Sequence, residues 1–294
     1  MSYRIARSLA EVEAALARDA SALTIFAGGT DLMVRARDRV AEGPVLDVAG
    51  VAELRGVALE GDDLVLGACV TYADCLANPL VAGACPLLVR VAERFASPLI
   101  RNVATLGGNV ANASPAGDGV AALWALDARV EALTPGGRLA RPIAEVVLGP
   151  GRLGLPAGSV LTAFRVPVAV AGEGAAFYKL VNRAWPEHPM AISVASVAAR
   201  LRFDPDGRVT LARLVLGAVA PTPVRAPAAE AVLLGGPPDP ARLAEASRLA
   251  AEAARPIADM RASADYRRAV LPALVRAAVE AASQAARRSG YAGA

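Results

Sequence analysis

The sequence is poor in the residues that bind metals and act as nucleophiles: it has 3 Cys and 1 His in 294 residues. Cys69, Cys75 and Cys85 form no C-x-x-C pair and are odd in number, so they predict neither a disulfide framework nor a zinc site, but reduced, buried thiols. An iron–sulfur cluster usually needs four ligands, so this chain is expected to hold none by itself. His188 has no partner motif, which favours a structural or surface role.

Long apolar runs are also missing, although 55% of the residues are hydrophobic. The longest, such as 190–199 and 214–220, fall well short of the ~20 residues that cross a bilayer, so no membrane span is expected. Charges at Arg7 and Glu11 come too early for a secretory signal, which makes the cytoplasm the default location. Aromatic residues are only 4%, and basic residues are interleaved with acidic ones, so no nucleic-acid partner is expected.

The common catalytic motifs are absent. G-x-S-x-G, H-E-x-x-H and G-x-x-x-x-G-K-[ST] do not occur, which argues against the commonest hydrolase, zinc-protease and P-loop sites. Residues 149–154 match G-x-G-x-x-G, but a dinucleotide fingerprint needs its third glycine at the start of a helix. Pro156 and Gly158 follow at once, so we expect a surface turn there.

The order of helix and strand patterns predicts an α+β protein of about two domains. We expect a compact first unit in which a capping box at 8–11 and a helix lead to strands at 23–27 and 45–48. Further elements are expected as a hairpin at 57–66 and a second one formed by residues 129–134, a turn at 135–137 and residues from 138 onward. Helices are expected at 72–76, 86–95 and 120–126, strands at 160–166, 191–203 and 209–219, and helices at 228–234, 240–254 and 266–288. The small-residue stretch 168–174 is the expected boundary. It divides the chain into residues 1–173, with subdomains 1–55 and 56–173, and residues 174–294.

Two Gly-Gly motifs are the sharpest signal. Residues 26–31 (Phe-Ala-Gly-Gly-Thr-Asp) lead from a strand into a helix, and residues 105–109 (Thr-Leu-Gly-Gly-Asn) precede a polar stretch. Paired glycines let consecutive backbone N–H groups converge on an anion, and a helix N-terminus adds to the attraction. Two such loops suit a diphosphate, with Asn109, Ser114 and Asp118 as contacts to a sugar or polyol. The alternative is that both are tight turns with helix caps.

Lys179 is the only lysine, beside 30 arginines. A chain so poor in lysine can retain one where a compact ammonium group with flexible reach is needed. Chance retention at a solvated edge is the alternative.

Residues 27–31 and 105–118 together resemble the FAD-binding subunit of molybdenum hydroxylases. This family includes the medium subunits of bacterial carbon monoxide dehydrogenase and the flavin domain of xanthine dehydrogenase. The similarity runs nearly end to end, and residues 100–102, 218–225 and 262–268 share it. The resemblance implies a two-part FAD-binding domain of the vanillyl-alcohol-oxidase type, with a small β/α unit and a mixed sheet with helices. A C-terminal domain of antiparallel strands and helices follows.

The resemblance also implies the residues that bind FAD. The two motifs would wrap the diphosphate, Phe95 would lie against the cofactor, Leu161 would give an apolar backbone contact, and Asp118 and Lys179 would be polar contacts. The implied set is Ala27, Gly28, Gly29, Thr30, Asp31, Phe95, Thr105, Leu106, Gly107, Gly108, Asn109, Asp118, Leu161 and Lys179. Many relatives place an acid where this chain has residues 187–190, which leaves the flavin-edge contacts in 184–190 open.

The function that the resemblance implies is electron transfer. The organic substrate would be oxidised at a molybdopterin large subunit, and electrons would pass through two [2Fe-2S] clusters on a small subunit to FAD and an external acceptor. No acid, base, nucleophile or metal ligand is predicted on this chain, because the flavin carries the chemistry. The alternatives are a stand-alone FAD-dependent oxidase or reductase, and a scaffold subunit of the same fold without FAD.

Overall fold

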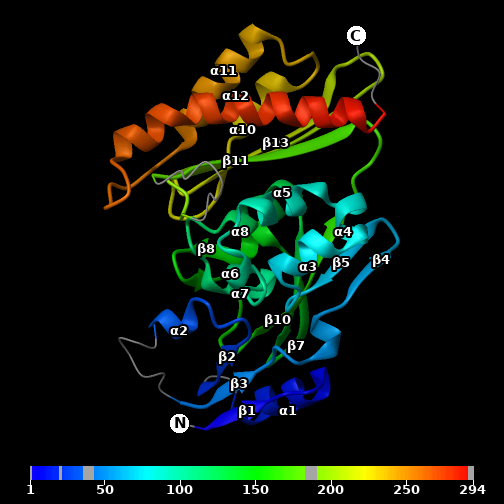
Figure 1. The fold of residues 1–294 in the computed structure, drawn as a ribbon, viewed down its shortest axis with the longest axis vertical. Coiled ribbons are helices and arrows are strands. Elements are labelled where there is room, and N and C mark those ends of the chain that lie inside the picture. Colours follow the sequence, from blue (N-terminus) through cyan, green and yellow to red (C-terminus); the bar gives the residue numbers. More distant parts are fainter. Residues whose placement is uncertain (1, 20–21, 36–42, 183–190, 291–294) are drawn as a thin grey trace.

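The computed structural model describes residues 2–19, 22–35, 43–182 and 191–290. Three larger sheets follow one another along an elongated molecule, with the N-terminus at one end and the C-terminal helices at the other (Figure 1), and a two-stranded sheet is the fourth among the described residues. Each sheet has helices packed on it, which makes the fold α+β as predicted. No helix among the described residues has both the length and the apolar character that crossing a membrane requires.

The first unit is a small parallel sheet in the order β1-β3-β2. Its elements are β1 (Tyr3–Ile5), α1 (Leu9–Asp19), β2 (Thr24–Phe26), α2 (Leu32–Arg35), β3 (Val45–Asp47) and the 3₁₀ turn η2 (Ala52–Leu54). α1 begins as predicted, because the Ser8 hydroxyl accepts the Glu11 N–H at 3.3 Å. Its buried face, with Val12 and Leu16, shares a core with Leu46 of β3.

The second unit is a sheet in the order β4-β5-β10-β6-β7, and every pairing is antiparallel. The resemblance implied a mixed sheet, and this detail is corrected, because the hairpins β4–β5 and β6–β7 both pair antiparallel with β10. The strands are β4 (Val57–Glu60), β5 (Asp63–Gly67), β6 (Arg129–Thr134), β7 (Gly137–Pro142) and β10 (Val160–Pro167).

Short helices cover the second sheet. They are α3 (Tyr72–Ala77), α4 (Pro79–Ala84), α5 (Pro86–Arg94), α6 (Pro98–Arg101), α7 (Leu106–Asn112), α8 (Asp118–Ala125) and α9 (Ile143–Val146). Proline stands at the start of α4, α5 and α6, where its missing N–H costs nothing. Residues 149–154 form the turn of a two-stranded hairpin, β8 (Val147–Gly149) and β9 (Arg152–Leu153), as expected for a surface turn.

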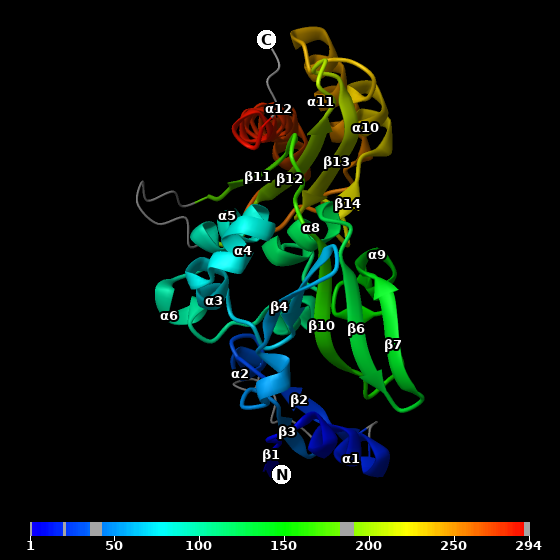
Figure 2. The ribbon, with the colours of Figure 1, turned by 90° about the vertical axis from the view of Figure 1, so that its right-hand side faces the viewer.

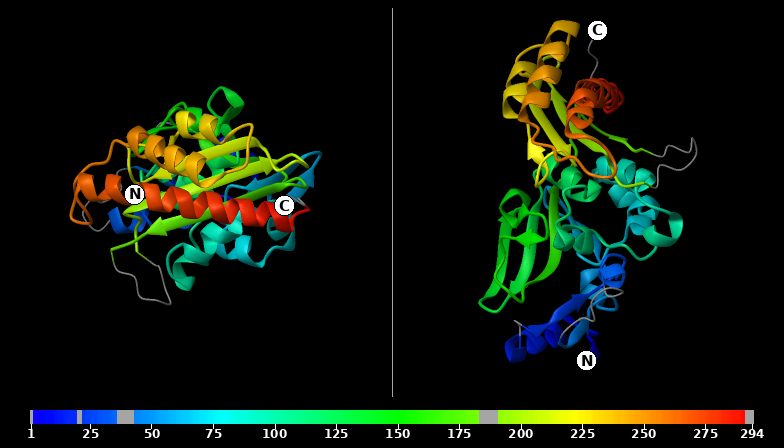
Figure 3. Two further views of the ribbon diagram at one scale, coloured as in Figure 1. Left: turned by 90° about the horizontal axis from the view of Figure 1, so that it is seen from above. Right: turned by 90° about the vertical axis from the view of Figure 1, so that its left-hand side faces the viewer.

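The C-terminal unit is an antiparallel sheet in the order β11-β12-β13-β14. It consists of β11 (Glu173–Leu180), β12 (Ala195–Phe203), β13 (Val209–Gly217), β14 (Val224–Arg225), α10 (Pro227–Leu233), α11 (Pro240–Ala253) and α12 (Ala264–Arg288). α10, α11 and α12 lie on one side of this sheet, and α5 and α8 lie on the other (Figures 2 and 3). Coverage on both sides explains why β12 is an almost continuous buried run rather than an alternating one.

A buried ion pair fastens the C-terminal sheet to the second unit. Arg200 of β12 donates to Glu173 of β11 at 2.7 and 3.1 Å, and to the carbonyl of Leu126 after α8 at 3.2 Å. Both charged side chains are 3% exposed. Glu173 is also paired with Arg202 at 2.9 Å, and Arg200 with Asp127 at 3.5 Å, so the pair is part of a charge network whose buried members are costly to leave unpaired. The packing of α8 against the sheet is therefore specified by charge as well as by shape.

Candidate functional site

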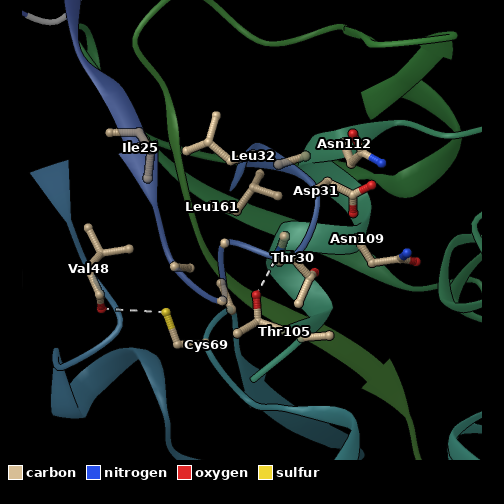
Figure 4. A pocket seen from close by; sticks show the side chains of 18 of the residues that line it. Ile25, Thr30, Asp31, Leu32, Val48, Cys69, Thr105, Asn109, Asn112 and Leu161 are labelled. Atoms are coloured by element: carbon tan, nitrogen blue, oxygen red, sulfur yellow. Dashed lines mark hydrogen bonds between the residues drawn. The ribbon is translucent and has the colours of Figure 1, made fainter. Parts of the chain in front are cut away.

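A cleft runs between the first and second units, and both Gly-Gly motifs line it. It encloses about 1070 Å³ of space between its walls, counting the part open to solvent. Figure 4 shows the labelled side chains of both motifs gathered around one space, with Leu161 of β10 among them. The members of the predicted set that line the cleft are Ala27, Gly28, Gly29, Thr30, Asp31, Phe95, Thr105, Gly107, Gly108, Asn109 and Leu161.

The first motif is the turn between β2 and α2, and its backbone N–H groups are free. No hydrogen bond joins the N–H groups of Gly28, Gly29, Thr30 and Asp31 to any described residue. The carbonyls of Gly29 and Asp31, by contrast, accept the N–H groups of Met33 and Arg35 as α2 begins. Successive N–H groups without protein partners at the edge of a cleft are suited to binding an anion. An anion would supply the hydrogen-bond acceptors that these donors lack.

The glycines of the first motif are required by the chain itself. A Cβ added to Gly28 would lie 1.9 Å from the Val103 carbonyl oxygen, so only glycine allows these two segments to touch. Gly29 has φ +68°, a left-handed conformation that favours glycine. The contact with Val103 brings the first motif beside the residues that lead into Thr105.

The second motif is a helix start rather than a loop, and this corrects the expectation that both motifs offer free N–H groups. Thr105 is the N-cap of α7, and its hydroxyl accepts the Gly108 N–H at 2.9 Å. The N–H groups of Leu106, Gly107 and Asn109 go to the carbonyls of Val70, Ala68 and Thr105. Every one of these donors is therefore already used, and the anion-binding donors come from the first motif.

The two glycines of the second motif have different surroundings. A Cβ added to Gly107 would lie 2.6 Å from the Ala68 carbonyl oxygen, whereas one added to Gly108 would meet only Thr105 Oγ1, at 2.9 Å. Gly107 is thus needed for chain packing. Gly108 instead presents bare backbone to the cleft, and Leu106 is fully buried away from it.

Phe95 forms an aromatic wall of the cleft. It follows α5, and its backbone turns through Ala96, which has φ +40°. Arg101 donates to the carbonyls of Phe95 and Ala96 at 2.9 and 3.0 Å, which holds this turn. The Phe95 ring stacks on the buried Tyr72 ring, with centroids 3.7 Å apart and planes 10° apart.

Asp118 and Lys179 lie together, but outside the residues that line the cleft. Lys179 Nζ of β11 is 2.9 Å from Asp118 Oδ2 at the start of α8, and the Ser193 hydroxyl donates to Asp118 Oδ1 at 2.7 Å. Lys179 also donates to the Ala191 carbonyl at 3.3 Å. The only lysine is therefore buried in an ion pair between the second and third sheets, not retained at a solvated edge. Ser114, a suggested sugar contact, caps a local turn through Ala116.

Comparison with known proteins decides the family. Residues 1–169 match the model of the FAD binding domain in molybdopterin dehydrogenase, and residues 176–282 match the CO dehydrogenase flavoprotein C-terminal domain. The chain belongs to the FAD-binding subunits of the molybdenum hydroxylases. This confirms the family, the fold class and the oxidoreductase type that the motifs indicated.

Individual relatives align with nearly the whole length of the chain. The chain is 31% identical to the putative xanthine dehydrogenase FAD-binding subunit of Escherichia coli strain K12, over 97% of both chains. It is 32% identical to the carbon monoxide dehydrogenase medium chain of Hydrogenophaga pseudoflava, over 95% and 96%. A solved carbon monoxide dehydrogenase of H. pseudoflava superposes with a TM-score of 0.90 over 96% of both chains, and quinoline 2-oxidoreductase of Pseudomonas putida 86 with 0.89 over 97% and 98%.

The residues of the cleft fit FAD. The first motif, with its free N–H groups, lines the same cleft as Gly108, and the apolar walls of the cleft suit the adenine and flavin rings. Arg35 of α2 is the one basic side chain among the described residues that line the cleft, and its guanidinium donates to Asn112 Oδ1. An exposed cation beside free amide donors favours a diphosphate.

Sequence reasoning missed several residues that line the cleft. They are Ile25, Leu32, Arg35, Val48, Ala68, Cys69, Ala104, Ala111, Asn112, Leu153, Ser159 and Val160. Arg35, Cys69, Asn112 and Ser159 carry the polar side-chain groups among them. Arg35 lies four residues after Asp31, on the helix that follows the first motif. This position close to the motif is the sequence feature that could have identified Arg35 as a cleft residue. The others lie on α2, α7, strands and turns, and the way these segments come together depends on the tertiary fold.

The described residues that line the cleft offer little acid–base chemistry. Burial raises the pKa of Cys69 to about 11, so its thiol stays protonated, and Sγ lies 3.5 Å from the Val48 carbonyl (Figure 4). No group of three or more His, Cys, Asp or Glu suited to a metal occurs among the described residues. His188 and the 184–190 segment expected near the flavin edge lie outside the described residues.

Proposed function

We propose that this chain carries electrons from [2Fe-2S] clusters on a partner small subunit, through FAD, to an external acceptor, while a molybdopterin large subunit oxidises the organic substrate. Several relatives are named as medium chains or subunits of such dehydrogenases, which supports this division of labour. The observation that carries the FAD assignment is that the N–H groups of residues 28–31, which have no partner among the described residues, line the same cleft as the bare backbone of Gly108.

The chain's own contribution is to bind and orient the cofactor. FAD supplies the redox chemistry when bound, accepting and releasing electrons through its isoalloxazine ring. The N–H groups of Gly28 to Asp31 and the Arg35 guanidinium would hold the diphosphate. Thr105 and Asn109 would face the cofactor from α7, and Phe95 and Leu161 would pack against it.

We include Asp118 and Lys179 in the proposed set, as residues at the edge of the cofactor site. Their ion pair is buried, with side chains 6% and 2% exposed, and it links α8 to β11. A buried pair of this kind fixes where its neighbours lie, because separating the charges is costly. The pair would thus set the position of the C-terminal sheet relative to the cleft.

We also propose that the domains divide at residues 173–174.

The alternatives make different predictions. A stand-alone oxidase or reductase needs an acid or base poised over the flavin, and Cys69 and Asp31 are the only acidic groups among the described residues that line the cleft. Cys69 stays protonated, and Asp31 is exposed at the start of α2. A scaffold subunit without FAD would have no use for the free donors and the open face of Gly108.

The test is to express the chain alone and together with candidate iron–sulfur and molybdopterin chains. We expect the purified chain to be yellow, with one FAD released per chain on denaturation. With its partners, it should co-purify with iron and molybdenum, and the flavin should be reduced when substrate is added under anaerobic conditions. A colourless chain that binds no added FAD would refute the cofactor assignment. Flavin that is reduced directly by substrate without the other chains would favour the stand-alone enzyme.

A further inference from the structure

Two buried oxygen atoms without hydrogen-bond partners meet beside the cleft. Among the described residues, Tyr72 Oη and Asn109 Oδ1 are both buried and both unpaired. They converge on Gly119 of α8: a Cβ added there would lie 2.0 Å from Tyr72 Oη and 3.0 Å from Asn109 Oδ1. One is a hydroxyl that can donate and the other is a carbonyl that can only accept, so each is the partner that the other lacks.

The backbone places these two side chains together. Residues 68–72 lie beside residues 104–107, with a bridge between Thr71 and Thr105. Across it, the Tyr72 N–H donates to the Ala104 carbonyl at 3.1 Å and the Leu106 N–H donates to the Val70 carbonyl at 2.9 Å. Tyr72 therefore begins α3 next to the start of α7, the helix that carries Asn109.

The Tyr72 ring is fixed as well. It is fully buried, and it stacks face to face on Phe95, the aromatic wall of the cleft. Burial raises the pKa of Tyr72 well above its ordinary value, so its hydroxyl keeps its proton and remains a donor. Asn109, in contrast, is only half-buried and lines the cleft.

We propose that Tyr72 is a positioning residue for FAD: on binding, its hydroxyl donates to Asn109 Oδ1, and the Asn109 Nδ2 donor is thereby turned toward the cofactor. Asn109 Oδ1 already lies inward, but without this bond no hydrogen bond holds it there, and an oxygen turned toward the phosphates would repel them. The bond also pairs two buried polar atoms that are otherwise unsatisfied, so cofactor binding and the pairing favour one another. This inference rests on the proposed FAD binding.

The experiment is a double-mutant cycle on FAD affinity, measured by titrating apoprotein with FAD and following flavin fluorescence. The variants are Tyr72→Phe, Asn109→Ala and the double variant. Tyr266→Phe, a partly exposed tyrosine of α12, is the matched control. The thermal midpoint of each apoprotein is measured alongside.

We expect Tyr72→Phe to raise the Kd for FAD about fivefold to tenfold, and the same substitution to add nothing in the Asn109→Ala background. The midpoint of the Tyr72→Phe apoprotein should rise, because a buried hydroxyl without a partner is removed. A merely structural tyrosine would lower the midpoint and show no coupling to Asn109.

Either of two results would overturn the proposal. One is an unchanged Kd for FAD in Tyr72→Phe, and the other is a double variant whose increase in Kd equals the product of the increases in the two single variants. In either case wild-type binding of FAD would leave the proposed function intact. Wild-type apoprotein that binds no FAD would overturn both.

Discussion

Gly108→Val tests the cofactor site most directly, because Gly108 is the motif glycine with free space in front of it. An added Cβ meets only Thr105 Oγ1, so the rest of a valine side chain has the cleft to occupy. The N–H of Gly108 is bonded to Thr105 and is not expected to contact the cofactor. The substitution therefore acts by filling space that the ligand needs.

The substitution is expected to weaken FAD binding far more than it destabilises the fold. Forcing extra carbon atoms into a packed contact costs about 3 kcal/mol, which corresponds to an increase of about 100-fold or more in the Kd for FAD. The fold loses much less. Valine is a better helix former than glycine by a few tenths of a kcal/mol, and disturbing the Thr105 cap costs about 1 kcal/mol. The apoprotein should thus unfold within about 4 °C of wild type.

The assay is the FAD content of the purified chain, followed by titration of apoprotein with FAD. Gly83→Val is the matched control, because Gly83 also lies in a short helix and an added Cβ there meets nothing within 4 Å. We expect the control to retain full FAD and Gly108→Val to retain almost none. Full flavin content and an unchanged Kd in Gly108→Val would refute the placement of the cofactor against α7.

Three further predictions concern charge and burial. Arg35→Gln should raise the Kd for FAD about fivefold at low salt, equivalent to ~1 kcal/mol, and should weaken the salt dependence of binding; a Kd unchanged at low salt would contradict a role for Arg35 at the diphosphate. Lys179→Met should destabilise the chain by about 3–5 kcal/mol in urea unfolding, because the Asp118 carboxylate stays buried without its cation, and adding Asp118→Asn should restore much of that loss. A double variant no more stable than the single one would argue against the pair. Burial raises the pKa of Cys75 to about 12, so a thiol reagent at pH 8 should label none of the three cysteines in the folded chain and all of them in urea; rapid native labelling would contradict the buried positions.

Local patterns in the sequence were sufficient for most elements near the site. The strand before Gly28, the helix that Pro86 begins and the hairpin turn after Gly149 all carry their signals within a few residues. β11 was not predicted, because its first half, Glu-Gly-Ala-Ala, has little strand propensity and continues the small-residue stretch 168–174. It is held by contacts made elsewhere in the chain, including the Glu173 carboxylate on Arg200.

At the site, too, some residues could be assigned from the sequence, whereas contacts between residues far apart along the chain could not. The motifs, Phe95 and Leu161 could be assigned from the resemblance, and the structure brings them to one cleft. The partners of the Leu106 and Gly107 N–H groups could not be foreseen, because their acceptors at Val70 and Ala68 are more than thirty residues away along the chain. The stacking of Tyr72 behind Phe95 is equally non-local.

The four motif glycines do not carry equal evidence for a cofactor. Gly28 and Gly107 are required by close approaches to the backbone at Val103 and Ala68, and Gly29 by its left-handed conformation. A scaffold protein with this fold that had lost FAD would still need all three. Gly108 has no such requirement, since only the capping hydroxyl of Thr105, and no backbone atom, lies near an added Cβ. Glycine at this position is therefore explained by a ligand lying against α7, and it is the one residue of the two motifs whose identity separates a flavoprotein from its empty counterpart.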